Sequence, residues 1–262
     1  MFETIAVVTD DRGVATLTLS RAEKHNAMSA LMISELTQAA EQLGRDEAVR
    51  VVVLTGSGKS FCAGGDLGWM RDQMAADAET RFTEARKLAE MLKALNEMPK
   101  PLIGALQGNA FGGGVGLASV CDVALGVDTL KMGLTETRLG LIPATIGPYV
   151  IARMGEARAR RVFMSARLFD AAEAVALGLL AKAVPADQLM RAVEDEITPY
   201  LSCAPGAVAS AKALVQNLGP RLDDSVIDHT IQALVARWET PEAREGIEAF
   251  FEKRNPKWNN KD

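Results

Sequence analysis

The first part of the chain combines short apolar runs with one clear helical period. Two runs rich in β-branched residues, Ile5–Val8 and Val14–Leu19, are separated by a short polar turn that ends in Gly13. This spacing predicts a β-hairpin. After Ser29, apolar residues recur every three or four positions through residues 31–43. That period predicts an amphipathic helix, and Ser29 is suited to cap its N-terminus.

Continuous apolar runs further along the chain predict buried strands. They occupy Val51–Leu54, Pro101–Leu106 and Val123–Leu125, and a run without polar alternation is typical of a strand covered on both faces. A helical pattern around Thr80–Glu97 lies between the first two runs. Strand and helix therefore alternate to about residue 145, which predicts an α/β fold.

From Pro148 onward the pattern is almost wholly helical, and only the apolar stretch Leu180–Val184 interrupts it. The predicted helices span Glu156–Met164, Ala171–Ala176, Asp187–Leu201, Ala207–Leu218, Asp223–Arg237 and Pro241–Lys253. We divide the chain into an α/β core, residues 1–200, and a helical C-terminal part, residues 201–262. The C-terminal part has apolar stripes but little core of its own. We therefore expect it to pack on another surface, and a neighbouring subunit is one candidate.

The composition is that of an ordinary globular protein, with 262 residues, 48% apolar residues and a formal charge of -5. An acidic balance without clustered Lys and Arg argues against a nucleic-acid-binding protein. No apolar run approaches the ~18 residues that a membrane span needs. Residues 1–11 lack the features of a cleaved targeting segment. We therefore expect a cytoplasmic protein that engages neither nucleic acid nor membrane.

The scarcity of histidine and cysteine narrows the possible chemistry. The three cysteines, Cys62, Cys121 and Cys203, are widely spaced, which predicts reduced, buried thiols. With only His25 and His229 in the chain, no cluster has metal-ligand spacing, and few bases are available for a nucleophile–His–acid triad. We expect no metal site and no triad hydrolase.

Two glycine-bearing segments carry most of the functional information. Residues 60–67 and 108–117 each follow a predicted buried strand and lead into a predicted helix. If the two segments face each other, two backbone N–H groups can point at one developing oxyanion. Such turns also serve packing alone. The second segment lacks the Gly-Lys-Ser/Thr of a phosphate-binding loop and does not fit a dinucleotide fingerprint.

Together these segments and several later ones carry a resemblance that neither carries alone. The shared motifs are Ala63-Gly64-Gly65-Asp66-Leu67, Phe111-Gly112-Gly113-Gly114, Cys121-Asp122, Glu136, Leu139–Pro143 and Phe250–Arg254. In order and spacing the chain resembles the enoyl-CoA hydratase/isomerase (crotonase) superfamily over almost its whole length. The resemblance implies a spiral of ββα units, helices at the C-terminus that take part in trimerisation, and often a dimer of trimers.

The resemblance also implies which residues contact an acyl-CoA. The oxyanion donors would be the backbone N–H groups of Gly65 and Gly113. Contacts to coenzyme A would come from Lys24, Ala63, Gly64, Asp66, Leu67, Phe250 and Lys253. Asp66 also matches a position that caps its loop, and several of the others have surface or packing roles as alternatives. No metal, flavin or nicotinamide cofactor is implied, because coenzyme A is part of the substrate.

The resemblance implies two positions for catalytic carboxylates, and this chain has a carboxylate at only one of them. Glu136 matches the second family position, whereas the first falls on Gly116, which has no proton to give. Asp122 is the nearest acidic residue but matches a structural position. A single carboxylate suffices to move a proton between two carbons, which would make the protein a 3-enoyl to 2-enoyl-CoA isomerase. Hydration requires that something else orient the water.

The sequence around Glu136 favours hydration. Residues 111–117, 134–144 and 147–151 resemble bacterial hydratases of 3-methylglutaconyl-type CoA esters, which also have glycine at the first carboxylate position. We therefore favour hydration of a branched or carboxylated 2-enoyl-CoA, which would place the protein in leucine degradation or fatty acid metabolism. A non-catalytic acyl-CoA-binding protein remains an alternative.

Two hypotheses concern how such a substrate would be held. The space over Gly116 could admit a water held by the substrate's own distal carboxylate, or Arg138 could pair with that carboxylate. Trp69, Met70, Met74 and Phe82 line the acyl pocket or belong to the core. A basic patch for the phosphates of coenzyme A would use Lys24, Lys253 and Arg254. The expected assembly is a homotrimer or hexamer.

Overall fold

The computed structural model describes residues 2–259, so residue 1 of the predicted core and residues 260–262 of the predicted helical part lie outside it. The predicted hairpin is confirmed as the antiparallel pair β1 (Ile5–Thr9) and β2 (Val14–Leu19). The helix after Ser29 is α1 (Ala30–Arg45), and the Ser29 side chain accepts a hydrogen bond from the Met32 N–H.

The larger sheet contains the strands that the apolar runs predict. Its order is β1-β2-β3-β5-β7-β10, and every neighbour after the first pair is parallel. The remaining strands of this sheet are β3 (Val51–Gly56), β5 (Leu102–Leu106), β7 (Val123–Val127) and β10 (Lys182–Val184). All five residues of β5 are buried, which explains why the sequence there shows no polar alternation.

A second sheet of very short strands accompanies the first. Its order is β4-β6-β8-β9, and the strands are β4 (Ser60–Cys62), β6 (Asn109–Phe111), β8 (Lys131–Gly133) and β9 (Phe169–Asp170). The three strand pairs β3-β4, β5-β6 and β7-β8 each contribute one strand to the large sheet and one to the small sheet before the chain continues into helix. This arrangement confirms the predicted spiral of ββα units.

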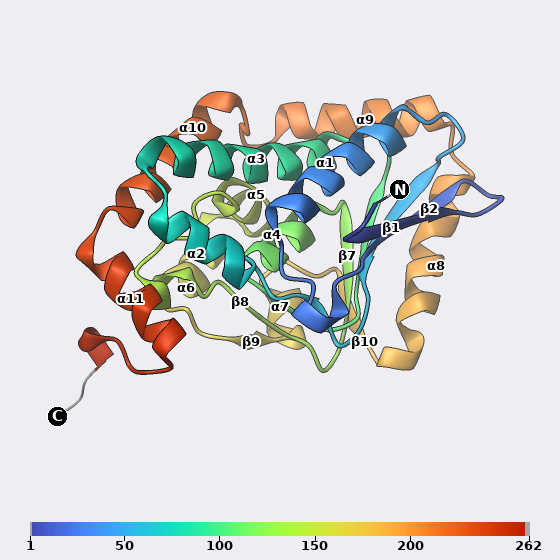
Figure 1. The fold of residues 1–262 in the computed structure, drawn as a ribbon. Coiled ribbons are helices and arrows are strands. Elements are labelled where there is room, and N and C mark those ends of the chain that lie inside the picture. Colours follow the sequence, from blue (N-terminus) through green and yellow to red (C-terminus); the bar gives the residue numbers. More distant parts are fainter. Residues whose placement is uncertain (1, 260–262) are drawn as a thin grey trace.

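Helices cover the large sheet and enclose the core. α1 and α3 (Ala78–Glu97) lie side by side, and α4 (Gly113–Val120) lies against α3 and α5 (Gly147–Met154) (Figure 1). The other helices before residue 202 are α2 (Leu67–Ala75), α6 (Glu156–Phe163), α7 (Ala171–Ala176) and α8 (Leu189–Leu201).

The C-terminal helices are α9 (Pro205–Leu218), α10 (Asp224–Trp238) and α11 (Pro241–Glu252). α10 packs on α3, and α11 packs on the short 3-10 helix η2 (Glu136–Leu139). Two of the three helices therefore cover surfaces of their own chain (Figure 1). α9 has no buried residue, and its apolar side chains Leu214, Val215 and Leu218 are exposed.

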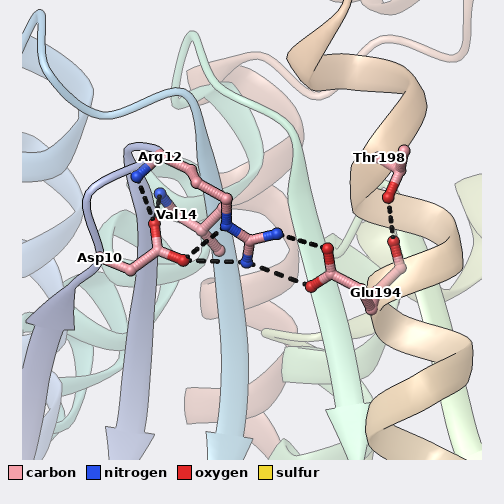
Figure 2. Close-up of polar contacts among 5 residues, drawn as sticks. All are labelled: Asp10, Arg12, Val14, Glu194 and Thr198. Atoms are coloured by element: carbon pink, nitrogen blue, oxygen red, sulfur yellow. Dashed lines mark hydrogen bonds and ion pairs between the residues drawn. The ribbon is translucent and has the colours of Figure 1, made fainter.

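The hairpin turn is joined to α8 by an ion-pair network. Arg12 contacts the Asp10 carboxylate at 2.9 Å and reaches across to Glu194, while the Thr198 hydroxyl donates to the Glu194 carbonyl (Figure 2). These side chains are about half exposed. Exposed pairs contribute little stability, whereas Asp10 shapes the turn itself by accepting hydrogen bonds from the Arg12 and Val14 N–H groups.

The cysteines differ from the prediction at one position. Cys62 and Cys121 are buried, and burial raises the pKa of each thiol to about 12. Cys203 is exposed, because it lies at the surface between α8 and α9, so the prediction of three buried thiols is wrong there. Within residues 2–259, no helix is both long and apolar enough to cross a membrane.

Candidate active site

The small sheet brings the two glycine segments into contact. β4 and β6 pair in parallel, so the segments that follow them leave the same edge of the sheet. Gly64 has a φ of +95°, and a Cβ there would lie 3.0 Å from the Phe111 carbonyl oxygen. At Gly114 a Cβ would lie 2.4 Å from the Cys62 carbonyl oxygen. Glycine at these positions is therefore required for the two backbones to approach each other.

Two unpaired backbone N–H groups border one cavity at this contact. Met28 bridges to the residues on either side of Gly65, which directs the Gly65 N–H away from Met28. Gly113 begins α4, where the first N–H groups have no partner within the helix. Among the described residues, neither N–H makes a backbone hydrogen bond. Both glycines line a cavity of about 470 Å³, which we call the Glu136 cavity.

Asp66 holds the first glycine segment in place. Its Oδ1 accepts a hydrogen bond from the Gly68 N–H at 2.8 Å, which caps α2, and its Oδ2 pairs with Arg21 at 3.0 Å. Partial burial raises the pKa of Asp66, but the Gly68 N–H and the Arg21 guanidinium outweigh it and lower the pKa overall. Asp66 thus stays ionised as a structural anchor and does not line the cavity.

Glu136 supplies the carboxyl group of the cavity. It is the first residue of η2, and its Oε1 would lie 3.0 Å from a Cβ at Gly112, where φ is +48°. The absent side chain at Gly112 therefore leaves room for the carboxylate. Oε2 is buried and has no hydrogen-bond partner among the described residues. Burial raises the pKa of Glu136 to about 7, so the group is poised to exchange protons near neutral pH.

Gly116 does not leave the open space that we predicted. A Cβ there would lie 2.5 Å from Cγ2 and 3.0 Å from Cβ of Ile146. Gly116 lies inside α4, is buried and does not line the Glu136 cavity, whereas Ile146 does. The hypothesis of a water in the space over Gly116 is therefore wrong, because an apolar side chain fills that space.

The residues assigned to coenzyme A separate into two groups. Ala63, Gly64, Leu67 and Phe250 line the Glu136 cavity, and Phe250 reaches it from α11. Lys24 and Lys253 are exposed and do not line it.

Of the predicted basic patch, Arg254 is already committed to other partners. It pairs with Glu245 and Glu252, each at 2.6 Å. The structure therefore does not gather Lys24, Lys253 and Arg254 at the cavity.

The predicted acyl-pocket residues are also divided. Trp69 and Met70 line the Glu136 cavity. Met74 packs against the cluster formed by η2 and α11, and Phe82 packs between α3 and α10, so for these two residues the core alternative is the correct one. Arg138 lines the cavity at its exposed side and forms none of the ion pairs of the described residues.

Several cavity residues were not predicted from the sequence. They are supplied by the segment before α1, by the segment that joins η2 to α5, and by α10, and include Met28, Thr145, Ile146, Leu234 and Trp238. Asp122, by contrast, has the structural position that we expected. It accepts a hydrogen bond from the Leu102 N–H at 2.7 Å and pairs with Lys212 at 2.8 Å.

Comparison with known proteins assigns the chain to a family. A family model described as enoyl-CoA hydratase/isomerase matches residues 9–261. The crystal structure of an enoyl-CoA hydratase from Shewanella pealeana is 38% identical, with a TM-score of 0.81 over 98% of this chain and 97% of that chain. The crystal structure of an enoyl-CoA hydratase from Mycobacterium avium is 30% identical, with a TM-score of 0.85 over 99% of this chain and 100% of that chain. An enoyl-CoA hydratase of Alternaria alternata is 35% identical over 80% of this chain and 68% of its own. The chain belongs to the enoyl-CoA hydratase/isomerase family.

Proposed function

We propose that this protein adds water to the double bond of a 2-enoyl-CoA thioester. The observation that carries the proposal is the buried carboxyl group of Glu136, whose Oε2 has no hydrogen-bond partner among the described residues and which lines the same cavity as Gly65 and Gly113, with their free N–H groups. In this arrangement the two N–H groups hold the thioester oxygen, and Glu136 moves the protons.

The chemistry follows from these three groups. Glu136 takes a proton from water while the water oxygen bonds to C3, and the electrons of the double bond move toward the thioester oxygen. The Gly65 and Gly113 N–H groups stabilise the resulting enolate, and one such donor contributes on the order of 10²–10³ in rate. The protonated Glu136 then returns the proton to C2, which completes the addition of one water. A pKa of about 7 lets Glu136 act as base and then as acid near neutral pH.

The proposed acyl group is branched or carboxylated, of the 3-methylglutaconyl type that arises in leucine degradation. Arg138 supports this assignment, since it is a cation on the wall of an otherwise largely apolar cavity and has no ion pair among the described residues. The proposed contacts to coenzyme A are the backbone of Ala63 and Gly64 with the side chains of Leu67 and Phe250, all of which line the cavity.

The proposed assembly is a homotrimer or a dimer of trimers. Exposed apolar side chains support it, namely Met164 after α6 and Leu214, Val215 and Leu218 on α9. Leu214 and Leu218 are four positions apart and therefore lie on one face of α9. An exposed apolar patch of this kind can mark an interaction site. Light scattering coupled to size-exclusion chromatography tests the assembly directly, and a monomeric mass would contradict it.

An isomerase that shifts a 3-enoyl double bond to the 2-position is the second candidate. It is favoured by one observation, the presence of Ile146 where a second carboxylate would stand, because isomerisation needs only Glu136. A non-catalytic acyl-CoA-binding protein would bind the same esters without turning them over.

The test is mass spectrometry on CoA esters incubated with the protein in deuterated water. The panel contains 3-methylglutaconyl-CoA, crotonyl-CoA and a 3-enoyl-CoA. Gain of one water by a 2-enoyl ester is the expected result, and the ester that gains it fastest defines the acyl group. Migration of the double bond with no water gained would instead establish the isomerase. Ester binding without any conversion would establish the binding protein.

A further inference from the structure

Hydration at a single carboxylate leaves one requirement unmet. A water that is hydrogen-bonded only to Glu136 can rotate away from C3. A second polar group is therefore needed to keep the water oxygen directed at C3. A second carboxylate cannot do this, because Ile146 fills the space over Gly116. Another polar side chain on the wall of the Glu136 cavity can supply the second partner.

Thr145 meets this requirement. It is only 6% exposed, it lies in the segment between η2 and α5, and it lines the Glu136 cavity together with Glu136. Its hydroxyl makes no side-chain hydrogen bond to any described residue. The Tyr149 hydroxyl also has no partner but is fully enclosed, whereas the Thr145 hydroxyl is not. A buried hydroxyl without a protein partner is expected to bond to water or to a ligand.

The position of Thr145 distinguishes it from the other free hydroxyl of the cavity. Thr145 directly precedes Ile146, the residue whose side chain fills the space over Gly116. Thr135 also lines the cavity but is more exposed and directly precedes Glu136. Thr145 reaches the cavity from the segment before α5, whereas Glu136 reaches it from η2.

We infer that the Thr145 hydroxyl is the positioning group that holds the attacking water beside Glu136. The inference rests on the proposed hydration. The Thr145 hydroxyl forms a hydrogen bond with the water, and no proton is transferred between them. The proton of the water still goes to Glu136, the oxygen bonds to C3, and Glu136 delivers the proton to C2. Enolate formation at C2 involves only Glu136 and the oxyanion donors, so it does not depend on Thr145.

The experiment separates these two steps. Thr145→Val removes the hydroxyl at nearly constant shape, and Thr145→Ser keeps it. Each variant is assayed for hydration of 3-methylglutaconyl-CoA and of crotonyl-CoA, and for exchange of the C2 proton of butyryl-CoA in deuterated water. Thr137→Val is the matched control, because the Thr137 hydroxyl already donates to the Met164 carbonyl.

The expected result is a fall in the kcat of hydration of roughly tenfold or more for Thr145→Val, the rate equivalent of about one hydrogen bond. The rate of C2 exchange and the KM of Thr145→Val should stay within about twofold of the wild-type values. Thr145→Ser should recover most of the hydration rate, and Thr137→Val should hydrate like the wild type.

Three outcomes would overturn the assignment. Hydration by Thr145→Val at the wild-type rate would do so, as would an equal loss of hydration and C2 exchange without rescue by Ser, since that indicates a structural role. A larger loss in Thr135→Val than in Thr145→Val would move the role to Thr135. If the wild-type protein exchanges C2 protons but hydrates no ester, the proposed hydratase activity is wrong. That result is distinguishable from a failure of the Thr145 assignment, in which the wild type still hydrates an ester.

Discussion

Replacing Glu136 with Gln should stabilise the folded protein at alkaline pH, although it removes the proposed acid–base group. Burial raises the pKa of Glu136 to about 7 from its ordinary value of 4.5. A carboxylate that is desolvated in this way is more costly to ionise in the folded chain than in the unfolded chain. Gln has a similar shape and cannot ionise, so the variant escapes that cost.

The magnitude follows from the two pKa values. Below 4.5 the carboxyl group is protonated in both states and costs nothing extra. As the pH rises from 4.5 to about 7, the unfolded chain releases the proton while the folded chain keeps it, so the free energy of unfolding falls. Above about 7 both states are ionised and the loss is complete, at roughly 3 kcal/mol.

The assay is equilibrium urea unfolding of the wild type and Glu136→Gln at about pH 5 and about pH 8, at one protein concentration. The stability of the variant relative to the wild type should rise by about 2–3 kcal/mol between the two pH values. Any cost of burying the Gln amide is the same at both and cancels. Glu248→Gln is the control, since Glu248 is exposed on α11 and pairs with no described residue. If the stability of the variant relative to the wild type does not change with pH, Glu136 is not a buried carboxyl group with a raised pKa.

Two further predictions concern packing and thiol exposure. Gly116→Ala should lower the free energy of unfolding by about 1–3 kcal/mol, because its Cβ would overlap Ile146. In a double-mutant cycle with Ile146→Ala, measured by urea unfolding, the two costs should not add, and additivity would contradict the contact. In the native protein Ellman's reagent should react with Cys203 alone, because burial raises the pKa of Cys62 and Cys121 to about 12. Three reactive thiols before denaturation would contradict the burial pattern.

The elements with strong local signals were predictable from the sequence. Val51–Leu54 is apolar throughout because β3 is covered on both faces, and this burial is what the run of apolar residues reports. Ser29 caps α1 through a hydrogen bond from Met32, three residues along the chain, so the helix start depends on local chemistry. The hairpin β1–β2 likewise depends on a local turn.

The small sheet was not predictable in the same way. Its strands have two or three residues each, which is too short for a period-2 pattern to be distinguished from a loop. β4 and β6 exist because they pair with each other across about fifty positions of sequence. Pairing at that distance leaves no local signature, and this sheet sets the position of both glycine segments.

The candidate site shows the same division. Gly65, Gly113 and Glu136 stand in motifs that carry a recognisable resemblance, and the structure brings all three to one cavity. Ile146 could not be assigned to Gly116 from sequence, because the two residues are thirty positions apart and belong to successive turns of the spiral. Lys24 and Lys253 matched family positions, but matching a position does not determine whether a side chain reaches the cavity.

The central claim is that Glu136 is the group that moves the protons, and one measurement tests it most directly. This measurement is the rate of crotonyl-CoA hydration by Glu136→Gln together with the dissociation constant of the variant for the same ester. We expect a rate at least about a hundredfold below that of the wild type, with nearly unchanged affinity. Hydration by the variant at close to the wild-type rate would contradict the account.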